Sequence, residues 1–204
     1  MANETRNALE KAIAIFQGHG GMMLTSEAIK AGIHPRTLYA MRDAGILDRL
    51  SRGLYRLADL PPLSNIDLVS VARKVPHGVI CLISALAYHQ ITTQIPHEVY
   101  LALERGAEPP RVKYPPVRVF WFTRKAFTHG VETHQLDGVT VRIYSVEKTV
   151  ADCFKYRNKI GLDTAIEALK FYRQRKDFSI DRLLKFARIC RLENIMRPYM
   201  EAML

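Results

Sequence analysis

The sequence predicts an α+β protein, with an N-terminal winged helix-turn-helix followed by a mixed α/β domain that ends in a helical segment. Three observations support this fold class. Two short helical patterns joined by a tight turn precede a short hairpin pattern within the first 60 residues. Runs of β-branched and aromatic residues then alternate with helical patterns. Between these regions stands Pro61-Pro62, which interrupts regular structure and stiffens a connection. We therefore expect domains at residues 1–60 and 61–204.

The first region begins with a helix and a short strand. Apolar residues at helical spacing predict a helix from about Glu4 to Phe16, and the residues that set this spacing are Ala8, Ala12, Ile15 and Phe16. A short strand is expected at residues 22–24. Thr25 or Ser26 would cap the helix that follows, by accepting a hydrogen bond from a backbone N–H group.

The segment LTSEAIKAGIHPRTLYAMRDAGIL, residues 24–47, is typical of two helices joined by a tight turn. Gly32 can take the positive φ that such a turn needs, and Ile33 beside it can fill the core. Pro35 suits the first turn of the second helix, where its missing N–H group has no partner in any case. Gly45 is a natural C-terminal stop for that helix.

The second helix has distinct inner and outer faces. Leu38 and Met41 define the inner face, whereas the residues expected to point outward are Arg36, Tyr39, Ala40 and Asp43. Thr37 and Arg42 flank the outer face. Arginine and tyrosine near the start of a helix suit contact with base edges and phosphates in the major groove. Asp43 fits this only if it orients Arg42 or Arg36. The alternative is an ordinary helical hairpin with a solvated face.

The segment LDRLSRGLYRL, residues 47–57, predicts two short strands about Arg52-Gly53, the size of a wing. Arg49, Arg52 and Arg56 are spaced along it, with Tyr55 between them. Basic residues on a wing can contact phosphates or enter the minor groove. A surface hairpin with scattered arginines is the alternative. The predicted DNA-binding residues are Lys30, His34, Arg36, Thr37, Tyr39, Arg42, Arg49 and Arg52.

The second region mixes helical and strand patterns. The predicted helices are 63–75, 80–90, 162–175, 180–190 and 192–203, together with one that starts after Ser145 and ends at Gly161. The predicted strands are 99–103, 117–122 and 139–144. Asp137-Gly138 predicts a hairpin turn before the last of these strands. Val150, Phe154, Ile160 and Leu162 are expected in the core.

Charge favours a polyanionic partner. The chain has 30 Lys and Arg against 20 Asp and Glu, a net charge of +10. Residues 61–204 carry +8 of this excess and residues 1–60 carry +2. The second region is thus the more basic. We expect a cytoplasmic chain, because no apolar run could span a membrane, no signal-peptide pattern is visible, and three separated cysteines suit buried thiols.

An enzyme would need a catalytic constellation, which the sequence does not indicate. Cys153 falls on an apolar helix face and is expected in the core. His129 and His134 lack the i, i+4 spacing of a helical metal pair. His89 and His97 bracket TTQIP, where we expect them to hydrogen-bond the backbone. No phosphate-binding glycine loop is present. We therefore expect a protein that is not an enzyme and has no cofactor or metal.

The order of these parts, with ALAYHQITTQIPHEVYLAL (residues 85–103) and SVEKTVADCFKYRNKIGLDTAIEAL (residues 145–169), resembles AbiEi-type antitoxins of type IV toxin–antitoxin pairs. The resemblance covers nearly the whole chain. Its most specific parts are residues 92–96 and 149–163, and the start is less specific. In the recognition helix and the wing, the residues that match are Arg36, Thr37, Tyr39, Arg49 and Arg52.

The resemblance implies a repressor of its own operon that also counters a nucleotidyltransferase-like toxin in bacterial abortive infection, without a stable complex. It implies binding to double-stranded DNA at an inverted repeat in the promoter. No dimer element is visible, so we expect a monomer or a dimer formed on DNA. Lys155, Arg157 and Lys159 could form a second phosphate-binding surface or simply stabilise a helix end. An orphan regulator, or a protein that binds RNA or another partner, remains the alternative.

Overall fold

The structure is a computed structural model that describes residues 2–202. Residues 2–60 form helices around a small antiparallel sheet with strand order β1-β3-β2. The elements are α1 (Ala2–Gly18), β1 (Met22–Leu24), α2 (Thr25–Lys30), α3 (Pro35–Asp43), β2 (Leu47–Ser51) and β3 (Leu54–Leu57). They follow the predicted order of helix, strand, two helices and hairpin.

Residues 61–202 form a mixed five-stranded sheet and a helical end. The first elements are α4 (Ile66–Lys74), β4 (Val79–Ile80), α5 (Leu82–Tyr88), β5 (Val99–Glu104), β6 (Val117–Phe122) and α6 (Arg124–Thr128). The remaining ones are β7 (Val131–Leu136), β8 (Val139–Tyr144), α7 (Val146–Lys155), α8 (Arg157–Ile160), α9 (Leu162–Arg173), α10 (Ile180–Ile189) and α11 (Glu193–Glu201). The strand order is β6-β5-β4-β8-β7. The structure is therefore a mixed α+β fold.

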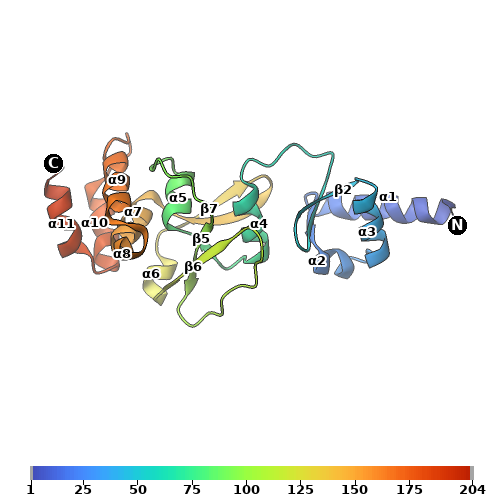
Figure 1. Cartoon of the computed structure of the whole chain (residues 1–204), viewed down its shortest axis with the longest axis horizontal. Helices are drawn as coiled ribbons and strands as arrows, with labels where there is room; N and C mark the ends of the chain where they lie inside the picture. The colour runs from blue at the N-terminus through green and yellow to red at the C-terminus, as the bar shows by residue number, and fades with distance from the viewer. Residues whose placement is uncertain (1, 203–204) are drawn as a thin grey trace.

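The larger sheet separates two apolar layers, because alternate residues of a strand face opposite sides. Leu101 and Leu103 of β5 join the layer under α4, whereas Tyr100 and Ala102 join the layer under α5 and α7. Helix α7 also packs against α9 and α10. Figure 1 shows the resulting elongated molecule, with α1–α3 at one end, the larger sheet in the middle and α8–α11 at the other end.

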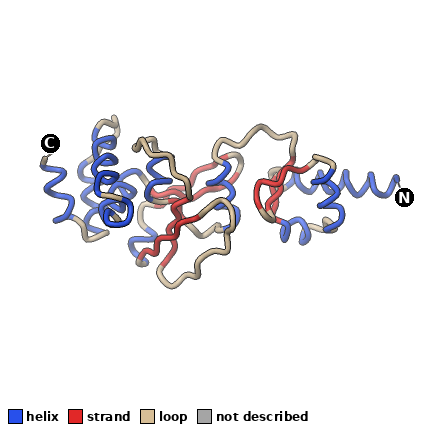
Figure 2. Tube along the Cα trace, viewed as in Figure 1, coloured by secondary structure: helices blue, strands red, loops and turns tan. Residues whose placement is uncertain are grey.

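The two regions meet through the small sheet. A long loop joins them, with strands gathered on either side of it (Figure 2). Met22 of β1 and Leu54 of β3 form a buried cluster with Val69 of α4. Arg73 of α4 forms a salt bridge with Glu27 of α2 and donates a 3.3 Å hydrogen bond to the Met22 carbonyl oxygen. The hairpin strand β3 is consequently buried along its whole length.

Several predicted boundaries are wrong. The helix expected from residue 63 begins at Ile66, because the backbone N–H groups of Ser64 and Asn65 donate to the Asp137 carboxylate instead. Ile80 pairs with Leu101 in β4 and is not helical. Strand β7 and helix α6 were not predicted. The helix expected to run to Gly161 ends at Lys155, and α8 follows after Tyr156.

The other predicted strands and helices are present with shifts at their ends. The first helix begins before residue 4, at Ala2, and Ala8 on it is exposed. Leu162 is 36% exposed and is not a core residue, since it starts α9 at the surface. The last predicted helix extends to Met203, which lies outside the described residues.

Candidate nucleic-acid interface

The turn between α2 and α3 fixes the direction of α3. Gly32 has a φ of +93°, a conformation that favours glycine, as predicted. The backbone N–H group of Ile33 donates to the Ala28 carbonyl oxygen at 2.9 Å, and the Ile33 side chain is buried. Leu38 and Met41 are fully buried beneath α3. This packing turns the opposite face of α3 outward.

The cap predicted for α2 is wrong, and α3 has a cap that was not predicted. The Leu24 N–H group donates to the Glu27 carboxylate at 2.7 Å, so neither Thr25 nor Ser26 caps α2. The Thr25 hydroxyl instead donates to the Gly53 carbonyl oxygen at 3.4 Å, which ties the hairpin turn to α2. At the start of α3, His34 Nδ1 accepts from the Arg36 N–H group at 3.2 Å.

The outer face of α3 carries two arginines and a tyrosine, and one of the arginines is paired with a carboxylate. Arg36 is exposed, and Tyr39 is 42% exposed. The Arg42 guanidinium lies 5.2 Å from the centre of the Tyr39 ring and 2.6 Å from Asp43 Oδ1. The hydrogen bond that Arg42 donates to the Asp43 carboxylate raises the pKa of Arg42. Asp43 therefore orients Arg42, one of the two roles considered for it, and Thr37 is half-buried at the margin.

The hairpin presents only some of its arginines. Arg49 on β2 and Arg52 in the turn are exposed, and so is Lys30 at the end of α2. Arg56 is only 8% exposed, and its guanidinium donates to the carbonyl oxygens of Leu60 and Pro61. The expectation that Arg56 is available on the wing is therefore wrong. It instead holds the start of the connection between the regions.

The hairpin turn also faces basic residues that sequence reasoning missed. A hollow of about 780 Å³ is lined by Arg52 together with Lys74 at the end of α4 and Arg111 and Lys113 of the β5–β6 loop. That loop holds 12 residues, 105–116, between two parallel strands. A long loop with basic residues and a Pro-Pro pair is the signal that could have indicated a binding segment.

The predicted second basic surface is partly committed to structure. The Arg157 guanidinium donates to the Phe154 carbonyl oxygen at 2.8 Å, near the end of α7. Lys155 Nζ lies 5.1 Å from the Phe122 ring centre, and Lys159 Nζ lies 5.9 Å from that of Tyr156. The two lysines thus lie near aromatic rings, whereas Arg157 bonds the end of α7, in line with the structural alternative.

The segment TTQIP is fastened to α9. The Thr92 and Thr93 hydroxyls donate to the Glu167 carboxylate at 2.7 and 2.6 Å, and the Gln94 amide donates to the Thr164 hydroxyl at 2.8 Å. Burial alone would raise the pKa of Glu167, but the hydrogen bonds from Thr93 and Thr92 hold it below its ordinary value. This motif therefore joins the loop after α5 to the helical end of the chain.

The residues examined as catalytic or metal-binding candidates are Cys153 and several histidines, and most of them are buried or bond the backbone. Burial raises the pKa of the Cys153 thiol well above its ordinary value. His89 bonds the Tyr144 carbonyl oxygen at 2.7 Å, and His129 bonds that of Lys125 at 2.7 Å. His97 is exposed. Within residues 2–202, no three His, Cys, Asp or Glu residues gather as metal ligands. No helix in that range is long and apolar enough to cross a membrane.

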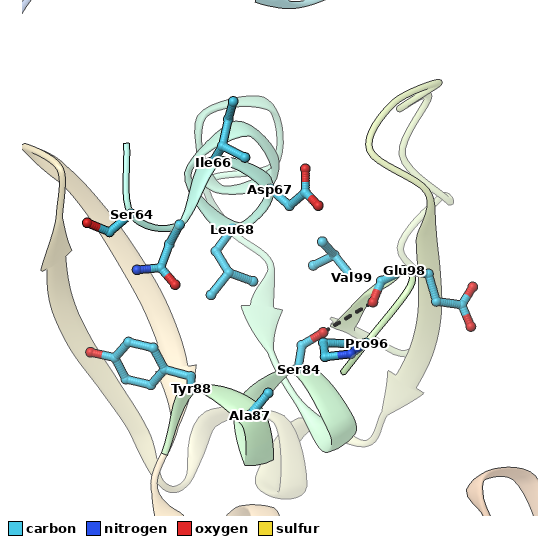
Figure 3. A pocket seen from close by; sticks show the side chains of 11 residues that line it. Ser64, Ile66, Asp67, Leu68, Ser84, Ala87, Tyr88, Pro96, Glu98 and Val99 are labelled. Atoms are coloured by element: carbon cyan, nitrogen blue, oxygen red, sulfur yellow. Dashed lines mark hydrogen bonds between the residues drawn. The ribbon is translucent and has the colours of Figure 1, made fainter. Parts of the chain in front are cut away.

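A smaller hollow of about 290 Å³ lies between α4 and α5 (Figure 3). The Ser84 hydroxyl at its floor donates to the Glu98 carbonyl oxygen at 3.3 Å and accepts from the Tyr100 N–H group at 2.9 Å. The Glu98 carboxylate points away from the hollow. Ser84 therefore holds α5 against β5.

Comparison with known proteins finds one family model that matches the first part of the chain. Residues 10–58, which span most of α1 to the end of β3, match the family described as transcriptional regulator, AbiEi antitoxin. The predicted resemblance is confirmed over that stretch. No curated protein matches the chain.

Among solved structures, the crystal structure of the RV2827C protein from Mycobacterium tuberculosis is similar, with a TM-score of 0.58 at 13% identity. The aligned region covers 87% of this chain and 69% of the RV2827C chain. At this identity the likeness shows a shared fold alone.

Proposed function

We propose that residues 1–60 form a winged helix-turn-helix domain that binds double-stranded DNA and represses transcription of the chain's own operon. The observation that carries this proposal is the outer face of α3, inside the stretch that matches the regulator family, where Arg36 and Tyr39 are exposed and Arg42 is half-buried. A helix presented in this way, beside a basic hairpin, suits the major groove and the flanking backbone.

The residues would divide between reading bases and holding phosphates. Arg36 and Tyr39 would contact base edges, because both are exposed near the start of α3. The phosphate contacts would come from Lys30, Thr37, Arg42, Arg49 and Arg52. His34 would contribute through Nε2, since Nδ1 caps α3. Two copies would bind one inverted repeat. The free chain would be a monomer, and any dimer would form on DNA.

Residues 61–204 would form the antitoxin domain. The family description supports an antitoxin role, and we propose that it counters a nucleotidyltransferase-like toxin in abortive infection, a form of antiviral defence, without a stable complex. We propose a cytoplasmic protein that works by binding, not catalysis, and needs no cofactor. Co-expression with a neighbouring toxin gene would test the antitoxin role, and an orphan regulator would fail to rescue growth.

The first experiment is a salt-titrated binding assay on the DNA upstream of the chain's own gene, with a scrambled duplex of equal length as control. Operator binding should weaken steeply as salt rises and should still favour the promoter over the scrambled duplex. Binding that does not distinguish the two duplexes would contradict the repressor role. It would direct the search to proteins and RNA.

A further inference from the structure

The hollow beside the hairpin turn combines parts of both regions of the chain. Leu24 and Arg52 come from the small sheet, Lys74 and His77 follow α4, and Arg111 and Lys113 come from the β5–β6 loop. These segments lie far apart in the sequence, so the fold is what creates the hollow. With a volume of about 780 Å³, it is open enough to admit part of a polymer backbone.

The charge around the hollow is strongly unbalanced. Four cationic side chains line it, namely Arg52, Lys74, Arg111 and Lys113, against the single carboxylate of Glu108. Among the described residues, no carboxylate lies within 4 Å of Arg52, Arg111 or Lys113. Burial lowers the pKa of Lys74, whose ammonium donates to the Tyr114 carbonyl oxygen at 3.0 Å. Cations gathered in this way repel one another, and an anion would relieve the repulsion.

The two sides of the hollow are held in a fixed relation. The salt bridge between Arg73 and Glu27 joins α4 to α2, and the Arg73 guanidinium also reaches the Met22 carbonyl oxygen at 3.3 Å. The apolar contact of Val69 with Met22 and Leu54 adds buried area at the same junction. Lys74 of α4 also bonds the Tyr114 carbonyl oxygen in the basic loop. Because α2 leads into the turn before α3, these contacts connect the loop to the region that carries α3.

We propose that this hollow is a phosphate-binding groove for the backbone of the same duplex whose bases α3 contacts. The proposal deepens the proposed function and rests on it. It makes Arg111 and Lys113 DNA-contacting residues, with Lys74 lining the same hollow, so the C-terminal region becomes part of the DNA interface. Arg111 would offer a planar, bidentate donor to a phosphate, and Lys113 a compact ammonium.

The test compares two double variants that each remove two positive charges. Arg111→Ala with Lys113→Ala changes the groove, whereas Lys170→Ala with Arg173→Ala changes exposed residues on α9. Binding of the full chain to promoter and scrambled duplexes is measured over a range of salt. Melting temperatures close to wild type would show that both variants fold.

The groove variant should lose about two released counterions, so the slope of log K against log salt should fall by roughly 1.8. If counterion release is the whole effect, affinity at about 0.1 M salt falls roughly 60-fold on both duplexes. The α9 variant should keep the wild-type slope.

An unchanged slope in the groove variant would overturn the groove while leaving the repressor role intact. Equal loss of slope in both variants would also overturn it, since net charge alone would then explain the effect. If the wild-type chain does not prefer its promoter, the repressor role fails, and the slopes on the scrambled duplex decide the groove separately. Calorimetry with inorganic phosphate provides the last arm. The groove variant could lose phosphate binding while its slope of log K for DNA against log salt stays unchanged. That result would overturn the proposal and would indicate that the hollow binds a small anion instead of DNA.

Discussion

Replacing Lys148 with methionine should destabilise the chain strongly, because it leaves a buried carboxylate without its partner. Lys148 and Asp152 are both fully buried on successive turns of α7 and form a salt bridge. The ammonium also lies 4.1 Å from the Tyr144 ring centre, and Asp152 accepts from the Cys190 thiol at 3.5 Å. Removal of one partner from such a pair costs about 3–5 kcal/mol. For a chain of this size, that corresponds to a fall in Tm of roughly 6–20 °C.

The measurement is urea unfolding followed by circular dichroism, at several pH values. Burial raises the pKa of Asp152, while Lys148 opposes that rise. Without Lys148, the folded-state pKa rises further above the unfolded value of about 3.9. A carboxyl group whose pKa is raised in the folded state contributes stability at low pH. That contribution is lost as the pH rises through the folded-state pKa. The loss in free energy of unfolding caused by Lys148→Met should therefore be large at pH 7 and become smaller as the pH approaches 4.

The double variant Lys148→Met with Asp152→Leu is the control, because it removes both charges and leaves no stranded group. It should recover most of the lost stability. A single variant that loses less than about 1 kcal/mol would refute the reasoning. So would a deficit that does not change with pH, or a double variant as unstable as the single one.

Three further predictions concern separate parts of the chain. Arg36→Ala should weaken operator binding by about 1–3 kcal/mol and relax base preference at one position, with Tm unchanged because the side chain is exposed; equal loss on scrambled DNA would contradict a base contact. Gly32→Ala should cost roughly 1–3 kcal/mol in urea unfolding, because φ is +93° there, and a loss within error would argue against strain. Burial lowers the pKa of His89, so the unfolded chain takes up the extra proton and stability falls as pH drops through about 6.5. In His89→Gln, stability should fall less as the pH drops, and identical stability profiles in the variant and wild type would show that His89 does not cause the fall.

Local signals in the sequence predicted the turns of the structure well. Gly32, Gly45 and Gly138 all have positive φ, and Pro35 occupies the first turn of α3, as expected. Each of these positions is governed by the backbone of its own segment, so a few neighbouring residues are enough to indicate it. The inner and outer faces of α3 followed from helical periodicity for the same reason.

Features that depend on distant contacts were not predictable in this way. Arg56 looks like a surface residue of the hairpin, but its partners are the carbonyl oxygens of the connection that follows. The late start of α4 depends on Asp137, more than 70 residues further along the chain. Strand β7 was missed because it is an edge strand with mostly polar residues, and its pairing with β8 defines it. Similarly, the groove beside Arg52 exists only once the two regions are packed together.

The burial of β3 on both faces has a consequence for how the chain can be divided. Tyr55 and Leu57 pack into the core of the N-terminal region, whereas Leu54 packs with Val69 of α4. A fragment cut at Pro61-Pro62 would keep every element that matches the regulator family, yet it would expose the apolar side of a short sheet to water. Such a fragment should be prone to self-association. A truncation meant to keep the N-terminal region folded would be better placed after α4, so that Val69 and Arg73 still shield that side.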